Sequence, residues 1–102
     1  MNFYEQENNK TVLKTREIIR ELPEFCNEFF LDLNQNTLPK TRMGYAYDLR
    51  VFFNFLVTEN KEFLGRDIKS LTLDDLQKIK VVDINQFMDY LAYYVSDEDS
   101  QL

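Results

Sequence analysis

The clearest pattern in the chain is a stretch of about twenty residues, 39–58, in which apolar side chains recur at helical spacing. Side chains at i, i+4, i+7 and i+11 stack on one face of an α-helix. Those positions are occupied here by Tyr45, Leu49, Phe52 and Leu56. The stretch has no proline after its first residue, so it predicts a helix of more than about five turns. We expect this helix to be the centre of the core, with Leu49 and Phe52 fully buried.

The predicted central helix has two unequal sides. Phe53 and Phe55 widen its apolar stripe, so other elements are expected to cover most of its second half. The opposite side is predicted to stay open to water or to a partner, and it carries Lys40, Met43, Tyr47, Arg50 and Asn54.

Shorter segments precede the central helix. Residues 1–10 are polar and predict a disordered lead-in, and residues 11–20 predict only a turn or two of helix. Pro23 suits the first turn of a helix, where its missing N–H costs nothing. An amphipathic helix is expected from there to about Leu33, and its apolar face holds Phe25, Cys26, Phe29, Phe30 and Leu33. Residues 34–37 predict a loop.

The sequence after residue 71 predicts the start of a third helix. Thr72 can cap the helix, and Asp75 stands three residues later, as in a capping box. Leu71 can pack on Leu76 across this start as a hydrophobic staple. The pattern predicts a short helix over about 73–80, with its inward side formed by Leu73, Leu76 and Ile79.

A second set of capping and staple residues predicts the start of a fourth helix. Asp83 is expected to be the N-cap, Gln86 stands at N3, and Val82 can pack on Phe87. The predicted helix covers about 84–95, and one face carries Ile84, Phe87, Met88, Leu91 and Val95. The polar residues 96–102 predict a frayed tail.

These patterns together predict an all-α protein. No alternating strand pattern competes with the helices, and only two glycines and two prolines are present, too few for the turns of an all-β fold. The length of 102 residues fits one domain. We expect a small bundle of four main helices within residues 21–95, with a possible short N-terminal helix in a lead-in over 1–20 and a tail over 96–102.

Charge is distributed unevenly along the chain. The formal net charge is −6, yet residues 40–80 carry eight Lys or Arg against six Asp or Glu. The remaining residues carry four basic against twelve acidic side chains. The acidic total therefore hides a mildly basic middle, which fits either an ordinary solvated surface or a surface that nucleic acid can approach.

The sequence offers little for catalysis. It has no histidine, its single cysteine cannot form a zinc site alone, and no glycine-rich phosphate loop is present. We therefore expect no cofactor and no metal, and we predict that this chain alone is not an enzyme. No apolar run approaches the roughly twenty residues needed to span a bilayer, and no secretory signal is visible, so the default expectation is a cytoplasmic protein without a membrane partner.

One pattern resembles a known family. The order T-x3-Y-x2-D-L-x2-F-x2-F-L is reproduced by Thr41, Tyr45, Asp48, Leu49, Phe52, Phe55 and Leu56. It resembles the N-terminal core-binding domain of tyrosine recombinases, the phage integrase family, which has a SAM-like helical fold. Residues 23–33, 71–79 and 81–91 are similar to the neighbouring helices of that domain. The family has Ser before the proline that begins its second helix, whereas Leu38 stands there in this chain.

The resemblance implies a function in DNA recombination and integration. It implies a domain that clamps duplex DNA opposite a catalytic domain absent from this chain, so that the chain is a fragment of a longer recombinase. The implied partners are duplex DNA, that catalytic domain and other recombinase protomers. The DNA-binding residues it implies, from the two helices that face DNA in the family, are Lys40, Thr41, Arg42, Tyr47, Arg50 and Asn85.

A function of another class stays open from the residues alone. A small helical module that binds proteins and no nucleic acid fits the acidic balance and the many aromatic side chains. Tyr90, Tyr93 and Tyr94 near the end of the chain could form part of such a docking surface.

Overall fold

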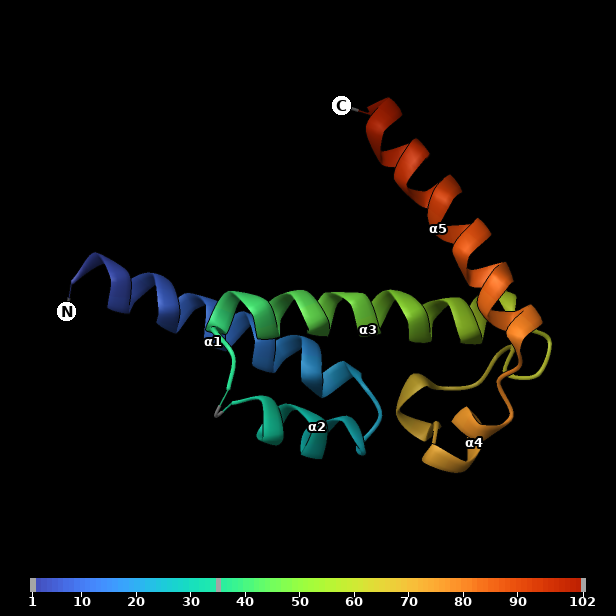
Figure 1. Ribbon diagram of the computed structural model, residues 1–102, viewed down its shortest axis with the longest axis horizontal. Coiled ribbons are helices and arrows are strands. Elements are labelled where there is room, and N and C mark those ends of the chain that lie inside the picture. Colours follow the sequence, from blue (N-terminus) through green and yellow to red (C-terminus); the bar gives the residue numbers. More distant parts are fainter. Residues whose placement is uncertain (1, 35, 102) are drawn as a thin grey trace.

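The computed structural model is all-α, which confirms the predicted fold class (Figure 1). It describes the backbone of residues 2–34 and 36–101, and the side chains of these residues except 3–5 and 94–101. Within those residues it contains no strand. The elements are α1 (Phe3–Glu21), α2 (Cys26–Leu33), α3 (Pro39–Glu59), the 3-10 turn η1 (Ile68–Ser70), α4 (Leu73–Gln77) and α5 (Val81–Gln101).

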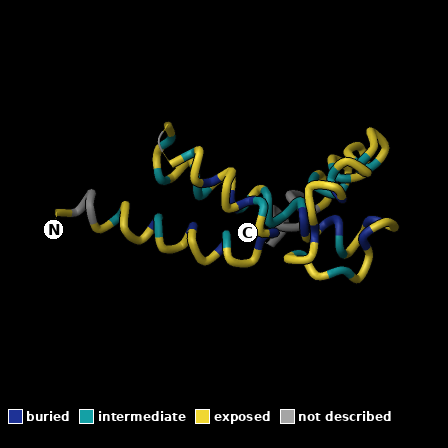
Figure 2. Tube along the Cα trace, turned by 90° about the horizontal axis from the view of Figure 1, so that it is seen from below, coloured by how far each residue is buried: buried dark blue, intermediate teal, exposed yellow. Residues whose placement is uncertain are grey.

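The helices are arranged around α3. α1 and α3 lie side by side and run in roughly the same direction (Figure 1). α2, which connects them in the chain, runs back the opposite way and lies below both in this view. The segment after α3 carries η1 and α4 on the side of α2, and α5 leaves from the C-terminal end of α3. Buried positions lie mainly near the middle of the molecule, and few lie toward the N-terminal end of α1 (Figure 2).

The core is formed by side chains from several helices and from the loops between them. Its largest fully buried side chains include Phe53 and Leu56 of α3, Ile18 and Leu22 at the end of α1, and Phe63 from the loop after α3. Rings of Phe25 and Phe53 meet edge to face with centroids 6.1 Å apart. The core therefore joins the loop before α2, the middle of α3 and the long loop before α4 into one unit.

α1 is much longer than the sequence predicted. It is one continuous helix of 19 residues, where only a turn or two after a disordered lead-in was expected. Its buried face follows an i, i+4, i+7, i+11 series that comprises Thr11, Thr15, Ile18 and Leu22. Two of these positions hold threonine, whose hydroxyls donate to the carbonyls of Glu7 and Thr11 one turn earlier, at 2.9 and 2.8 Å. These bonds satisfy the buried hydroxyls.

The burial of α3 also differs from the prediction. Leu49 and Phe52, expected to be fully buried, are only half-buried, and Tyr45 is 42% exposed. The fully buried positions are Ala46, Phe53 and Leu56, with Phe55 nearly so. The inward face is thus rotated from the Tyr45–Leu49–Phe52 stripe.

The long α1 explains this rotation. Arg42, Ala46 and Arg50 fall on one face of α3 at four-residue spacing. Arg42 shares a pocket with residues of α1, and Arg50 forms an ion pair with Glu21 at the end of α1. α1 therefore covers part of the side of α3 that was predicted to stay open, where Arg50 is half-buried, whereas Lys40 and Asn54 are exposed as expected. Part of the apolar stripe is left uncovered.

The start of α4 confirms its predicted capping box. The Thr72 hydroxyl accepts from the Asp75 amide at 3.2 Å, and the Thr72 amide donates to Asp75 Oδ2 at 2.9 Å. The helix is shorter than expected, because the amides of Lys78 and Ile79 bond three residues back and tighten the chain into a turn. Leu76 and Ile79 pack on the core, but Leu73, predicted to point inward, is 59% exposed.

The predicted start of α5 is wrong by several residues. The helix begins at Val81, and Asp83 lies inside its first turn at N3. Its Oδ2 atom accepts from the Lys80 amide at 2.8 Å, so Asp83 caps the helix from N3. Phe87 and Leu91 are half-buried on the inner face, as predicted. Ile84 and Met88 were predicted to share that apolar face, but both are exposed. The side chain of Val95 lies outside the described residues. The expected frayed tail over 96–102 is helical to Gln101, and Leu102 is outside the described residues.

Candidate functional site

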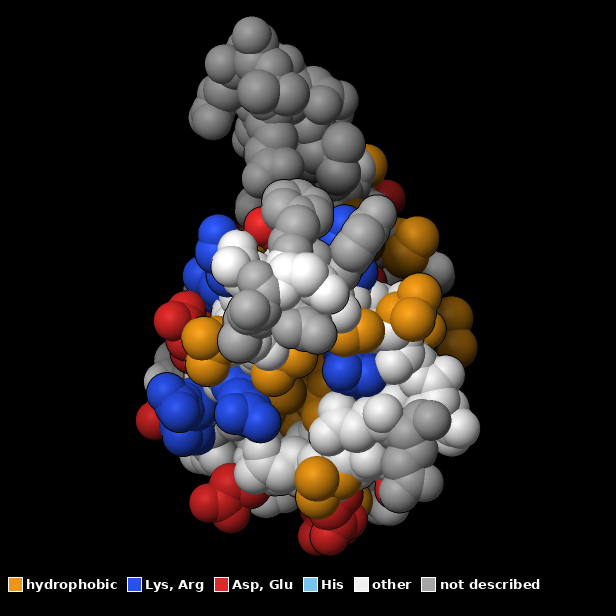
Figure 3. Space-filling view, turned by 90° about the vertical axis from the view of Figure 1, so that its left-hand side faces the viewer, with side chains coloured by type: hydrophobic (Ala, Val, Ile, Leu, Met, Phe, Trp, Pro, Cys, Tyr) orange, Lys and Arg blue, Asp and Glu red, His pale blue; other side chains and the backbone are white. Residues whose placement is uncertain are grey.

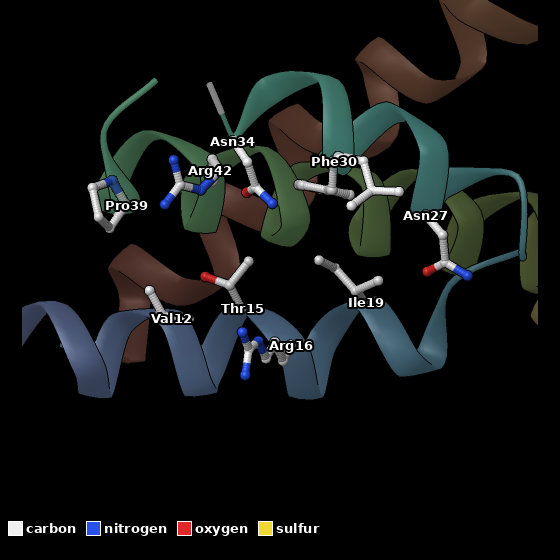
Figure 4. Close-up of a pocket in the computed structure, with 10 residues that line it drawn as sticks. Val12, Thr15, Arg16, Ile19, Asn27, Phe30, Asn34, Pro39 and Arg42 are labelled. Carbon is white, nitrogen blue, oxygen red and sulfur yellow. The ribbon is translucent and has the colours of Figure 1, made fainter. Parts of the chain in front are cut away.

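A pocket of about 320 Å³ opens where α1, α2 and the start of α3 meet (Figure 4). Its apolar walls are formed by Val12, Ile19, Phe30, Leu31 and Pro39. Its polar lining consists of Thr15, Arg16, Asn27, Asn34 and Arg42. In Figure 4, Arg42 and Asn34 lie on one side of the pocket, and Thr15 points from α1 toward that side.

The charge of this pocket has one sign. Arg16 and Arg42 are the only charged residues among those that line it, and no carboxylate is among them. This is unusual for a chain with eighteen acidic and twelve basic side chains. Two guanidinium groups beside amide and hydroxyl donors form a suitable environment for a phosphate or another anion, because guanidinium donors match the oxygens of such groups in pairs.

Arg42 is held in place by the loop before α3. Its Nη1 atom donates to the carbonyl of Thr37 and lies 3.5 Å from the Thr37 hydroxyl. That hydroxyl donates in turn to the carbonyl of Leu33 at 2.7 Å, which ties the loop to the end of α2. Within the described residues these contacts use Nη1 alone, so the Nε and Nη2 donors of Arg42 remain available for a ligand.

Arg16 differs from the two lysines of α1, and from Arg20 in lining the pocket. Lys10 and Lys14 form ion pairs with Glu7 and Glu17 on the same helix, at 3.9 and 3.6 Å. Arg16 is exposed at the pocket and forms no ion pair or hydrogen bond with the described side chains. Its charge is therefore available to a ligand.

The predicted cluster at the start of α3 is divided by the structure. Arg42 faces the pocket, whereas Lys40 and Thr41 are exposed and do not line it. Leu38 stands at the N-cap with extended backbone and provides no side-chain acceptor, and Pro39 begins the helix. The Leu38 side chain therefore does not neutralise the partial positive charge of the helix dipole, which lies beside Lys40 and Thr41.

Arg50 and Tyr47 form a separate contact. The guanidinium carbon of Arg50 lies 5.1 Å from the centroid of the Tyr47 ring, within cation–π distance. Its Nη1 atom lies 3.1 Å from Glu21 Oε2 of α1. A carboxylate therefore already accompanies the Arg50 charge, which joins α1 to α3.

Asn85 is distant from the pocket. It is exposed in the first turns of α5, and this helix packs on the C-terminal half of α3 through Phe87, whose ring centroid lies 4.9 Å from Phe52 and 5.2 Å from Phe55. Phe55 follows Arg42 by thirteen positions, which corresponds to about 20 Å along the helix axis. The structure therefore does not bring Asn85 together with Arg42.

Sequence reasoning missed Arg16. The signal that could have found it is the spacing of Thr11, Thr15, Ile18 and Leu22, which is the same helical series as in α3 if threonine is allowed at buried positions. Reading that series as a helix places Arg16 next to the buried Thr15. The packing of α1 then places Arg16 at the edge of the pocket.

The pocket belongs to a broader surface at one end of the molecule. Figure 3 views this end from the left of Figure 1 and shows Lys and Arg side chains on both sides of a hydrophobic hollow. Most Asp and Glu side chains in this view lie at its left and lower edges, and one lies above the hollow beside basic side chains. The basic side chains thus gather locally in a protein that is acidic as a whole.

Comparison with known proteins gave no relatives: no protein-family model, curated protein or solved structure matched the chain. The described residues contain no group of three or more His, Cys, Asp or Glu placed to hold a metal ion. None of the described helices has the length and apolar character needed to cross a membrane.

Proposed function

We propose that this protein binds duplex DNA, with a backbone phosphate seated in the pocket between α1 and α3. The observation that carries the proposal is the pairing of Arg16 and Arg42, from two different helices, in one pocket whose lining contains no carboxylate. In the proposed role the domain clamps DNA as the core-binding domain of a tyrosine recombinase does, and a catalytic domain supplies the chemistry.

Local charge decides whether such binding is favourable. The net charge of −6 repels DNA at long range, but the Debye length is only about 10 Å at moderate salt, so distant carboxylates are largely screened. At the pocket, two guanidinium groups act on the phosphate directly. The start of α3 adds a partial positive charge beside Lys40 and Thr41.

The proposal assigns unequal parts to the residues that the resemblance implied. Arg42 binds phosphate together with Arg16, and Lys40 and Thr41 contact the neighbouring backbone. Arg50 and Tyr47 act by fixing α1 against α3, since the Arg50 charge is paired with Glu21. Asn85, exposed on α5, serves as a second contact separate from the pocket.

Fluorescence anisotropy with a short labelled duplex at about 0.1 M salt, where distant carboxylates are screened, tests the proposal. We expect a dissociation constant on the order of 10⁻⁴ to 10⁻⁶ M, typical of contacts that do not read sequence. Arg16→Ala with Arg42→Ala should weaken binding by about tenfold or more. Wild-type protein that fails to bind the duplex under these conditions would contradict the proposal.

The matched control removes two cations elsewhere. Lys61 and Lys69 are exposed in the segment between α3 and α4, and neither forms an ion pair with the described residues. Lys61→Ala with Lys69→Ala changes the net charge by the same amount and should alter affinity by less than about twofold. Circular dichroism of both double variants checks that helicity is preserved.

A further inference from the structure

A second hollow lies on the side of the molecule where α2 and α4 face α3. This α2–α4 groove has a volume of about 400 Å³. Its walls include Phe25 and Phe29 on the α2 side, Leu49 and Phe52 from α3, and Leu73 and Leu76 from α4. It is separate from the arginine pocket, with which it shares no lining residue.

The groove exists because the most regular apolar stripe of the chain is incompletely covered. Leu49 and Phe52 belong to the stripe that by its spacing should be the buried face of α3, yet both are only half-buried. Their neighbours at the groove are more open still, with Phe29 45% and Leu73 59% exposed. Large apolar side chains that gather in one exposed hollow mark a surface suited to another apolar partner.

The charge at the groove is opposite to that of the arginine pocket. Glu28 and Asp32 are the only charged residues among those that line it. They stand one turn apart on α2, at a separation of about 6 Å along the helix. Neither forms an ion pair with the described Lys and Arg side chains, so both carboxylates are available to a partner.

From the apolar walls and the unpaired carboxylates together, we propose that the α2–α4 groove docks a basic amphipathic helix of a partner protein. Apolar side chains of that helix enter the groove at the i, i+3, i+4, i+7 spacing used in helix-in-groove recognition. Lys or Arg residues four positions apart on its flank pair with Glu28 and Asp32. The proposal does not depend on DNA binding, since it uses another surface and the opposite charge.

Charge also disfavours docking of DNA and of α5 from a second copy. A second copy of this chain carries a net charge of −6, and the exposed Ile84 and Met88 of its α5 stand beside Asp83 and Asp89. Docking of that helix would bring its carboxylates toward Glu28 and Asp32. DNA phosphates meet the same repulsion. A basic helix is the occupant that satisfies both the apolar walls and the acidic edge.

A designed peptide of leucine and lysine, with lysines paired at four-residue spacing along one flank, is the probe. Its binding to the full chain is measured by fluorescence anisotropy, next to a matched peptide in which glutamate replaces every lysine. We expect the lysine peptide to bind at least about tenfold more tightly than the glutamate peptide. Glu28→Lys with Asp32→Lys should weaken binding of the lysine peptide by about tenfold or more.

Two controls separate docking in the groove from attraction to an acidic protein. Glu59 and Glu62 are exposed at and just after the end of α3, and Glu59→Lys with Glu62→Lys changes the net charge by the same amount. This variant should bind the lysine peptide within about twofold of wild type. Leu73→Ser, at an exposed side chain, should weaken binding by about fivefold or more through the lost apolar contact.

Several outcomes would overturn the proposal. If the Glu59/Glu62 variant loses as much affinity as the Glu28/Asp32 variant, the attraction is diffuse and no groove site exists. An unchanged affinity for Leu73→Ser would show that the peptide binds elsewhere. Loss of duplex DNA binding in Leu73→Ser would assign the groove to DNA instead. A concentration-dependent dimer in sedimentation that Leu73→Ser abolishes would assign it to a second copy.

Discussion

Asn60 donates a hydrogen bond from its side-chain amide to Asp83, with Nδ2 and Oδ1 3.0 Å apart, and so joins the end of α3 to the start of α5. The side-chain oxygen of Asn60 accepts from the Glu62 amide at 2.9 Å, and the second oxygen of Asp83 accepts from the Lys80 amide. Asn60 is only 2% exposed and Asp83 is half-buried, whereas Glu62 and Lys80 are exposed, so this small network is a partly buried polar joint.

Asn60→Ala should therefore destabilise the fold by about 1–3 kcal/mol, because it leaves the partners of a buried amide without their hydrogen bonds. Urea unfolding followed by circular dichroism measures the change. A loss smaller than about 0.5 kcal/mol would mean that water replaces the amide at no cost and that the joint does not fix α5.

The observed inward face of α3 gives a second prediction. Phe53 is 1% exposed and packs edge to face on Phe25, so Phe53→Ala should cost about 3–5 kcal/mol. Tyr45 belongs to the stripe that the sequence favoured but is 42% exposed, and Tyr45→Ala should cost less than about 1 kcal/mol. Chemical denaturation that ranks the two variants in the reverse order would restore the sequence-based face and refute the observed one.

Gly44 gives a prediction of opposite sign. It lies in the interior of α3, and a Cβ atom added there meets no atom within 4 Å. Gly44→Ala should therefore raise stability by about 0.5–1 kcal/mol, since alanine loses less backbone freedom in a helix. Thermal unfolding checks this. A destabilised Gly44→Ala protein would show that this side of α3 is packed more closely than the structure shows.

Asp75 makes stability depend on pH at the acidic end. A hydrogen bond from Arg66, followed by that from the Thr72 amide, lowers its pKa from 3.8 to about 2. Between these values the unfolded chain binds more protons than the folded one, so the contribution of Asp75 is full above the ordinary pKa and is lost as pH falls toward 2. The stability difference between wild type and Asp75→Asn, measured by urea unfolding, should shrink over this interval. A difference that does not change with pH would mean that the folded carboxyl titrates normally.

Much of the helical frame followed from local sequence signals. The apolar spacing of 39–58 predicted α3 almost to its ends, and the Thr72–Asp75 capping box formed as expected because its hydrogen bonds join residues only three positions apart. The interactions that produce these features join residues within one or two helical turns, so the features can be recognised from the sequence alone.

The remaining differences came from tertiary contacts. Threonine at two buried positions of α1 concealed its helical series, and the resulting helix covers part of the polar side of α3 and leaves the Tyr45–Leu49–Phe52 stripe only partly covered. Asp83 resembled an N-cap but stands at N3, where it also accepts a hydrogen bond from Asn60, twenty-three positions earlier. In the candidate site, Arg42 was anticipated, but its partner Arg16 depends on the packing of α1 and not on any motif near α3.

The salt dependence of DNA binding tests the central claim most directly, because it counts phosphate contacts rather than overall charge. The logarithm of the binding constant falls linearly with the logarithm of salt concentration, at about 0.9 per neutralised phosphate contact. Arg16→Ala with Arg42→Ala should reduce this slope by about 2, and Lys61→Ala with Lys69→Ala should leave it unchanged. Equal slopes for wild type and the Arg16/Arg42 variant would contradict the assignment of the DNA phosphate to the pocket between α1 and α3.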